Sequence, residues 1–111
     1  MFNVQILNAR TLANKAAKLV SMAQIKNANP ETLDSMVKIA DRAQELYAIV
    51  KESDGGAIPA NIKSFIRNAD VMRKDYNARA VDGAYTKDQR ATFEALADEL
   101  AIVVRVAASV K

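Results

Sequence analysis

Residues 86–110 read TKDQRATFEALADELAIVVRVAASV and combine a helix start with a long apolar repeat. Thr86 and Gln89 match a capping box, in which two side chains satisfy backbone N–H groups at the beginning of a helix. Beyond this start, apolar residues recur at alternating spacings of three and four, which keeps one stripe of a helix facing a core. The stripe consists of Phe93, Leu96, Leu100, Val103, Ala107 and Val110. This stretch therefore predicts an amphipathic helix with a defined beginning.

The same repeat continues through the rest of the chain and is interrupted by short segments that end one helix and start the next. These breaks fall at residues 27–31, 53–59 and 81–86. In the first, Asn29 is a suitable N-cap and Pro30 suits the first helical position, where no N–H is needed. In the second, glycines 55–56 can take the left-handed conformation that ends a helix, and Pro59 opens the next one. In the third, Gly83 is the predicted C-terminal residue of the preceding helix.

Between the breaks, the predicted core stripes are clear in the second and third helices and broader in the first. The second stripe is Leu33, Met36, Ala40, Ala43, Tyr47 and Val50, and the third is Ile62, Phe65, Ala69, Met72 and Tyr76. In the first helix, Ile6, Ala9, Ala13, Ala16, Val20 and Ala23 compete with Leu12, Leu19 and Met22 on a neighbouring line. An alternative for residues 2–8 is a short strand or extended arm, because Phe2, Val4 and Ile6 alternate with polar residues.

Helices of about 20–24 residues joined by short turns make successive helices antiparallel neighbours. A chain of 111 residues suits one domain. We therefore predict an all-α protein, with residues 1–111 forming a single up-down-up-down antiparallel four-helix bundle. In the alternative form of this prediction, the bundle carries a short extended N-terminal arm.

The composition argues against the enzyme classes that a sequence most readily reveals. The chain has no Cys and no His, which removes thiolate nucleophiles, imidazole bases and the Ser-His-Asp triad. Di-iron sites in helical bundles use inward Glu and His side chains, and no Glu falls on a predicted stripe. The one-turn carboxylate pairs, Asp41 with Glu45 and Glu94 with Asp98, lie outside the stripes. We predict no enzymatic activity, no metal or other cofactor and no small-molecule substrate.

Neither end of the chain resembles a membrane or secretion signal. The start, MFNVQILNAR, is interrupted by polar residues, and Arg105 interrupts the most apolar segment, residues 100–110. That segment is about half the length needed to cross a bilayer. We therefore predict a cytoplasmic protein that does not enter a membrane.

The apolar residues exceed what one core stripe per helix requires. In residues 100–110, Ile102 and Val106 lie off the stripe, so the helix is apolar around nearly its whole circumference. One explanation is that this helix is the most central element of the bundle. The other is a contact surface for a second subunit or another protein, formed by Leu19, Met22, Ile25, Ile102 and Val106. Symmetric use of this surface would give a homodimer.

Basic residues provide a second candidate surface, since the net charge is +3 and the first predicted helix contains no acid. The candidate anion-binding residues are Lys15, Lys18, Lys26, Arg67 and Lys74. An up-down bundle places the first and third helices on a diagonal, so these side chains act together only after dimerisation. We predict a protein–protein interaction module, an adaptor, inhibitor or assembly subunit, that uses an apolar helix face with a basic rim. A module that binds nucleic acid or another polyanion is the alternative.

Overall fold

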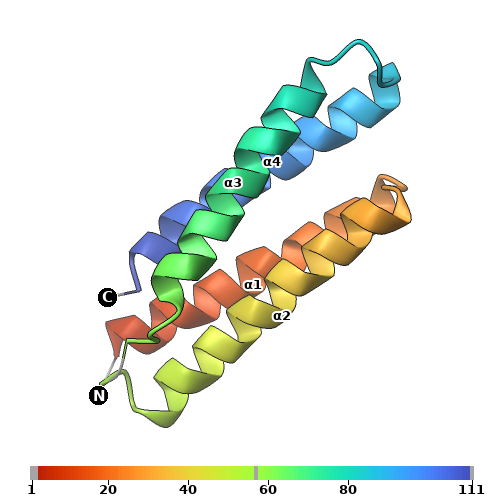
Figure 1. The fold of residues 1–111 in the computed structure, drawn as a ribbon. Helices are drawn as coiled ribbons and strands as arrows, with labels where there is room; N and C mark the ends of the chain where they lie inside the picture. The colour runs from red at the N-terminus through yellow and green to blue at the C-terminus, as the bar shows by residue number, and fades with distance from the viewer. Residues whose placement is uncertain (1–2, 57, 111) are drawn as a thin grey trace.

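The computed structural model describes residues 3–56 and 58–110, and these form four α-helices joined by short connections (Figure 1). The helices are α1 (Val4–Ile25), α2 (Pro30–Glu52), α3 (Ile62–Ala80) and α4 (Lys87–Ala108). The described residues contain no strand. The prediction of an all-α four-helix bundle is confirmed.

The starts of α2 and α4 follow the chemistry expected from the sequence. The Asn29 side chain accepts a hydrogen bond of 2.7 Å from the Thr32 N–H, and Pro30 is the first residue of α2. In α4 the capping box is complete. The Gln89 N–H donates to the Thr86 hydroxyl at 3.2 Å, and the Thr86 N–H donates to the Gln89 side chain at 2.9 Å. Both helix starts are therefore fixed by local hydrogen bonds.

The start of α1 contradicts the alternative of an extended arm over residues 2–8. The Asn3 side chain accepts a hydrogen bond of 3.1 Å from the Ile6 N–H, and the chain is helical from Val4 onward. This cap satisfies a donor that an extended arm would leave to water. Phe2 lies outside the described residues.

Two expected helix boundaries are displaced. The helix predicted to open at Pro59 begins at Ile62, because the Pro59 carbonyl first accepts the Ile62 N–H in a turn. Gly55 has the left-handed φ of +79° expected beyond the end of α2. Gly83 does not have a positive φ, and the prediction that it terminates α3 is wrong. The helix already ends at Ala80, and Gly83 lies in the turn that follows.

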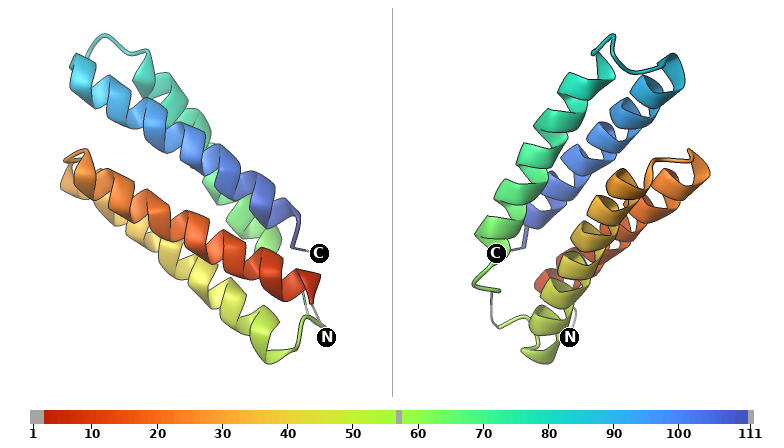
Figure 2. Two further views of the ribbon diagram at one scale, coloured as in Figure 1. Left: turned by 180° about the vertical axis from the view of Figure 1, so that it is seen from behind. Right: turned by 45° about the vertical axis from the view of Figure 1, so that its right-hand side comes forward.

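The helices pack as two antiparallel hairpins, α1–α2 and α3–α4, which are joined along α1 and α4. Figure 2 shows α1 and α4 side by side in the view from behind. In contrast, the backbones of α2 and α3 come close at few points, and those of the two diagonal pairs come close nowhere within the described residues. The bundle therefore has three packed interfaces and one open side, between α2 and α3.

The buried residues confirm the predicted stripe of α4, whereas the buried face of α2 is rotated relative to its predicted stripe. All six predicted residues of α4 are buried, from Phe93 to Val110. In α2, however, Ile39 and Leu46 are buried, whereas Leu33 and Tyr47 are only half-buried. The rotation brings Ile39 to the side of α2 that faces α3, where it lines the same hollow as Phe65, and it leaves Tyr47 at the edge beside Arg10 of α1.

The interface between α1 and α4 contains a charge that the sequence pattern did not reveal. Glu99 of α4 is only 9% exposed, although no Glu was expected on a core stripe. One of its carboxylate oxygens lies 3.0 Å from Nζ of Lys18 on α1. The other, Oε2, is buried and has no hydrogen-bond partner among the described residues. The ion pair thus crosses the interface that joins the two hairpins.

Replacing Lys18 with Met should destabilise the bundle by about 1–2 kcal/mol, because Glu99 would remain buried without its counter-charge. We place the loss below that of a fully buried pair, since half of the Lys18 side chain is exposed. Adding Glu99→Leu should restore the stability, because it removes the carboxylate and its unpartnered oxygen together. Urea unfolding of the three proteins measures both effects. A double variant less stable than Lys18→Met would contradict this account.

Candidate functional site

The open side of the bundle is hollowed along the length of α2 and α3. Two hollows of about 370 and 340 Å³ adjoin here and share Ser35, Asn68 and Met72 in their walls. Together they extend from Asn61 at the start of α3 to Arg79 near its end. We call this feature the α2–α3 groove.

The groove exists because small polar side chains stand where a closed bundle would have apolar ones. Ser35 of α2 and Ser64 and Asn68 of α3 line its walls. Burying these groups between two helices would cost free energy unless each found a hydrogen-bond partner. The buried residues of α3 are Ile62, Phe65, Ala69 and Tyr76, and the polar residues Ser64 and Asn68 stand beside them on the same helix. The sequence therefore favours an open α2–α3 side.

The half of the groove nearest the α2–α3 connection has an apolar floor and a basic rim. Ile39 and Phe65 are almost fully buried, and Met72 is half-buried beside them. Lys38 and Arg42 stand one helical turn apart on the α2 side and are both exposed. This half of the groove has no acidic residue in its lining.

The basic residues of the groove differ in how they are paired. Lys38 forms an exposed ion pair of 3.1 Å with Asp34, one turn earlier in α2. Such pairs are worth little and exchange readily. Within the described part of the chain, neither Arg42 nor Arg67 forms an ion pair. Arg67 lines the opposite wall, on α3. The two arginines are therefore available to an acidic ligand.

The other half of the groove contains a buried tyrosine in its lining. Tyr76 is 4% exposed, and its ring centroid lies 5.5 Å from that of Phe93 on α4. Burial raises the pKa of the Tyr76 hydroxyl, and the neighbouring side chains of Ser35 and Thr32 on α2 partly offset this. The hydroxyl therefore lies beside α2 at the groove floor. Arg79 covers both aromatic rings, at 5.6 and 5.5 Å from their centroids.

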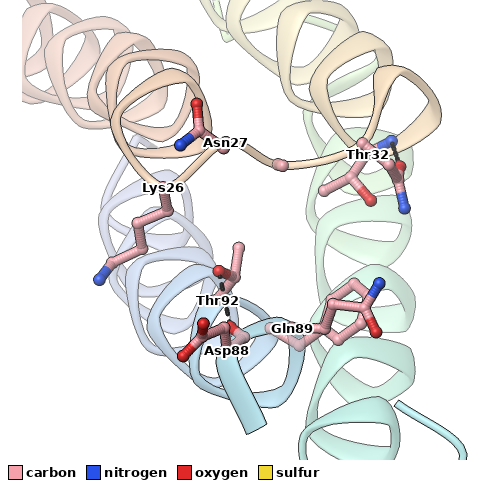
Figure 3. A pocket seen from close by; sticks show the side chains of 9 residues that line it. Lys26, Asn27, Thr32, Asp88, Gln89 and Thr92 are labelled. Atoms are coloured by element: carbon pink, nitrogen blue, oxygen red, sulfur yellow. Dashed lines mark hydrogen bonds between the residues drawn. The ribbon is translucent and has the colours of Figure 1, made fainter. Parts of the chain in front are cut away.

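A third hollow, of about 300 Å³, adjoins the groove at Thr32. Figure 3 shows it between the α1–α2 turn, with Lys26, and the first turns of α4, with Asp88 and Thr92. The Thr92 hydroxyl donates to the Asp88 carbonyl at 3.1 Å, and Gln89 is engaged in the capping box. Much of the polar lining on α4 therefore serves the helix itself, and we place the candidate site in the α2–α3 groove.

The apolar surface predicted from the sequence is largely occupied by the fold. Leu19 is fully buried, so its assignment as a partner contact is wrong. Met22 and Val106 are half-buried and pack against the core, and Ile102 is also half-buried. Only Ile25 is freely exposed, at 81%. The apolar surplus of residues 100–110 is explained by the position of α4, which packs against both α1 and α3.

The structure does not gather the predicted anion-binding residues on one surface. These residues are Lys15, Lys18, Lys26, Arg67 and Lys74. Lys18 is paired with Glu99, and Lys74 lies 3.4 Å from Asp70. Lys15 is half-buried, and Arg67 lines the groove. Because α1 and α3 make no contact, the two halves of this set stand on different sides of the bundle.

The groove residues Arg42, Ser64 and Asn68 were not singled out from the sequence. A signal was nevertheless present, since Asn61, Ser64 and Asn68 follow the same three-and-four spacing as the apolar stripe beside them. A polar line next to the core stripe of a helix marks the edge of its packed face.

Comparisons with known proteins found no matching family model and no curated protein or solved structure with significant similarity. Within residues 3–56 and 58–110, no three potential metal-ligating side chains gather into a site. None of the helices in this part of the chain is both long and apolar enough to cross a bilayer. The candidate function therefore rests on the groove.

Raising the pH above 10 should destabilise the protein through Tyr76. Burial raises the pKa of Tyr76 above its usual 10.0. The stabilisation of the neutral hydroxyl is therefore complete below pH 10 and is lost as the pH rises through the folded-state pKa. Urea unfolding midpoints between about pH 9 and pH 12 should fall less steeply for Tyr76→Phe than for the parent protein. The control, Tyr85→Phe, keeps Tyr76 and should follow the parent protein. If the urea midpoint falls equally steeply with pH in all three proteins, the assignment of the effect to Tyr76 would be contradicted.

Proposed function

We propose that this protein is a non-enzymatic protein–protein interaction module whose α2–α3 groove holds a segment of its partner. The observation that carries the proposal is the hollowed side between α2 and α3, whose backbones approach one another far less closely than those of the other three neighbouring pairs. The side left open has an apolar floor, formed by Ile39, Phe65 and Met72, beside the exposed bases Lys38 and Arg42. Adaptors, inhibitors and assembly subunits all use surfaces of this kind.

The shape of the groove favours a macromolecular segment over a small molecule. Small-molecule sites enclose most of the ligand's surface. This groove instead runs between two exposed helices from Asn61 to Arg79, a length of about 27 Å at 1.5 Å per residue. Docking of a helix or peptide in a surface groove needs such an elongated hollow with an apolar floor.

A photoreactive residue at position 68, in the wall shared by both hollows, should form a light-dependent adduct with a protein in cells that make this chain. The same residue at Asn77, exposed on the same helix and outside the groove lining, should form little or none. In pull-downs, Asn68→Trp should reduce recovery of that protein at least about tenfold by filling the groove, whereas Asn77→Trp should not.

The same photoreactive residue at position 25 tests the apolar surface predicted from the sequence, because Ile25 is the exposed member of that surface. Adducts from position 25 and none from position 68 would overturn the groove assignment. An adduct from position 68 that nuclease removes would mean that the ligand is nucleic acid. An adduct with a second copy of the chain, with a doubled mass by light scattering, would mean that the module assembles with itself.

A further inference from the structure

We propose that the occupant of the α2–α3 groove is an acidic amphipathic helix, bound with its acidic C-terminal end over Lys38 and Arg42. This inference rests on the proposed function and deepens it.

The charge of the groove is unequal along its length. Near the α2–α3 connection the lining carries Lys38 and Arg42 and no acid. Toward the other end it carries Glu31 and Asp75 as well as Arg67 and Arg79. Asp75 already neutralises Arg79, at 3.1 Å. The lining therefore has two more bases than acids near the connection, although Asp34 outside the lining pairs with Lys38, and equal numbers of both at the other end. A ligand's carboxylates are favoured at the end with the excess of bases.

Arg42 is the main anchor expected for those carboxylates. It is exposed, and no ion pair engages it within the described part of the chain. A guanidinium can bind a carboxylate through two parallel hydrogen bonds, which gives geometric selectivity as well as attraction. Lys38 can add its charge, since its exposed pair with Asp34 costs little to exchange.

A helix suits the groove better than an extended segment. An extended segment needs partners for its backbone N–H and C=O groups, and the described residues provide no strand edge. A helix satisfies its own backbone groups. Phe65 and Met72 are two turns apart on α3, with Ile39 opposite them on α2, so the apolar stripe of a bound helix can lie along them. The bound helix would complete the side that α2 and α3 leave open.

The dipole of the bound helix fixes its direction. The C-terminal end of a helix carries partial negative charge and its N-terminal end partial positive charge. The C-terminal end is thus favoured beside Lys38 and Arg42, and the N-terminal end beside Glu31. Ser64 and Asn68 form no side-chain hydrogen bonds within the described part of the chain and can bond polar residues of the ligand.

Nucleic acid is a poorer occupant for the same groove. Its phosphates would meet the carboxylates of Glu31 and Asp75 at one end. Base stacking needs exposed aromatic faces, and Phe65 and Tyr76 are both buried in the core. The apolar floor would have no matching group on a phosphate backbone.

The test is a display library of helical peptides of about 16 residues with a fixed apolar stripe and randomised charged positions. Selection against the immobilised protein should enrich Asp and Glu toward the C-terminal end of the peptides. Fluorescence anisotropy then gives the affinity of a selected peptide for the parent protein and its variants. Arg42→Glu should weaken binding at least about tenfold, and Arg105→Glu, an exposed arginine on α4, by less than about threefold. Circular dichroism confirms that each variant is folded.

The outcomes separate this inference from the proposed function. Loss of binding in Asn68→Trp, but not in Asn77→Trp, together with acidic selected peptides supports both. Neutral or basic peptides that Asn68→Trp still blocks would overturn the acidic helix and leave the interaction module standing. Peptides indifferent to Asn68→Trp, or no selected peptide at all, would overturn both. A single-stranded oligonucleotide is the remaining competitor. If it displaces the peptide, and if Asn68→Trp also blocks its own binding, the choice of a protein ligand would be overturned.

Discussion

The packing of α1 against α4 is the interaction on which the rest of the structure depends, because it alone joins the two hairpins closely. Small buried side chains on α1, such as Ala9 and Ala16, allow helices to approach one another. Larger residues of α4, such as Leu100 and Val103, are fully buried in the same core. Once α1 and α4 are paired, each also packs on its hairpin neighbour, and the apolar surface of the central pair is largely consumed.

The outer helices are consequently free to differ from the central pair. Neither α2 nor α3 needs to pack closely on the other, so Ser35, Ser64 and Asn68 can occupy the side between them. These residues keep that side open and also line it with hydrogen-bonding groups. The central pair thus supplies much of the packing, and in the proposed function α2 and α3 supply the recognition surface.

The parts of the fold that depend on neighbouring residues were predictable from the sequence, and the parts that depend on distant ones were not. The Thr86–Gln89 capping box is a local device, so its spacing is sufficient evidence. In contrast, the buried face of α2 depends on how many helices surround it, and Ile39 was misplaced for that reason. The same applies to Leu19, whose side of α1 faces the core. The pairing of Glu99 with Lys18 joins two helices that the sequence does not show to be adjacent.

The groove escaped sequence analysis because apolar periodicity reports where helices pack and not where packing stops. The information lay in the polar line of Asn61, Ser64 and Asn68, which borders the core stripe of α3. The side chains that give the groove its charge, such as Arg42 and Arg67, are exposed and contribute little to the core. They can therefore change with little effect on folding. Because its basic rim is independent of the α1–α4 interface, the charge of the groove can change while the bundle that supports it stays the same.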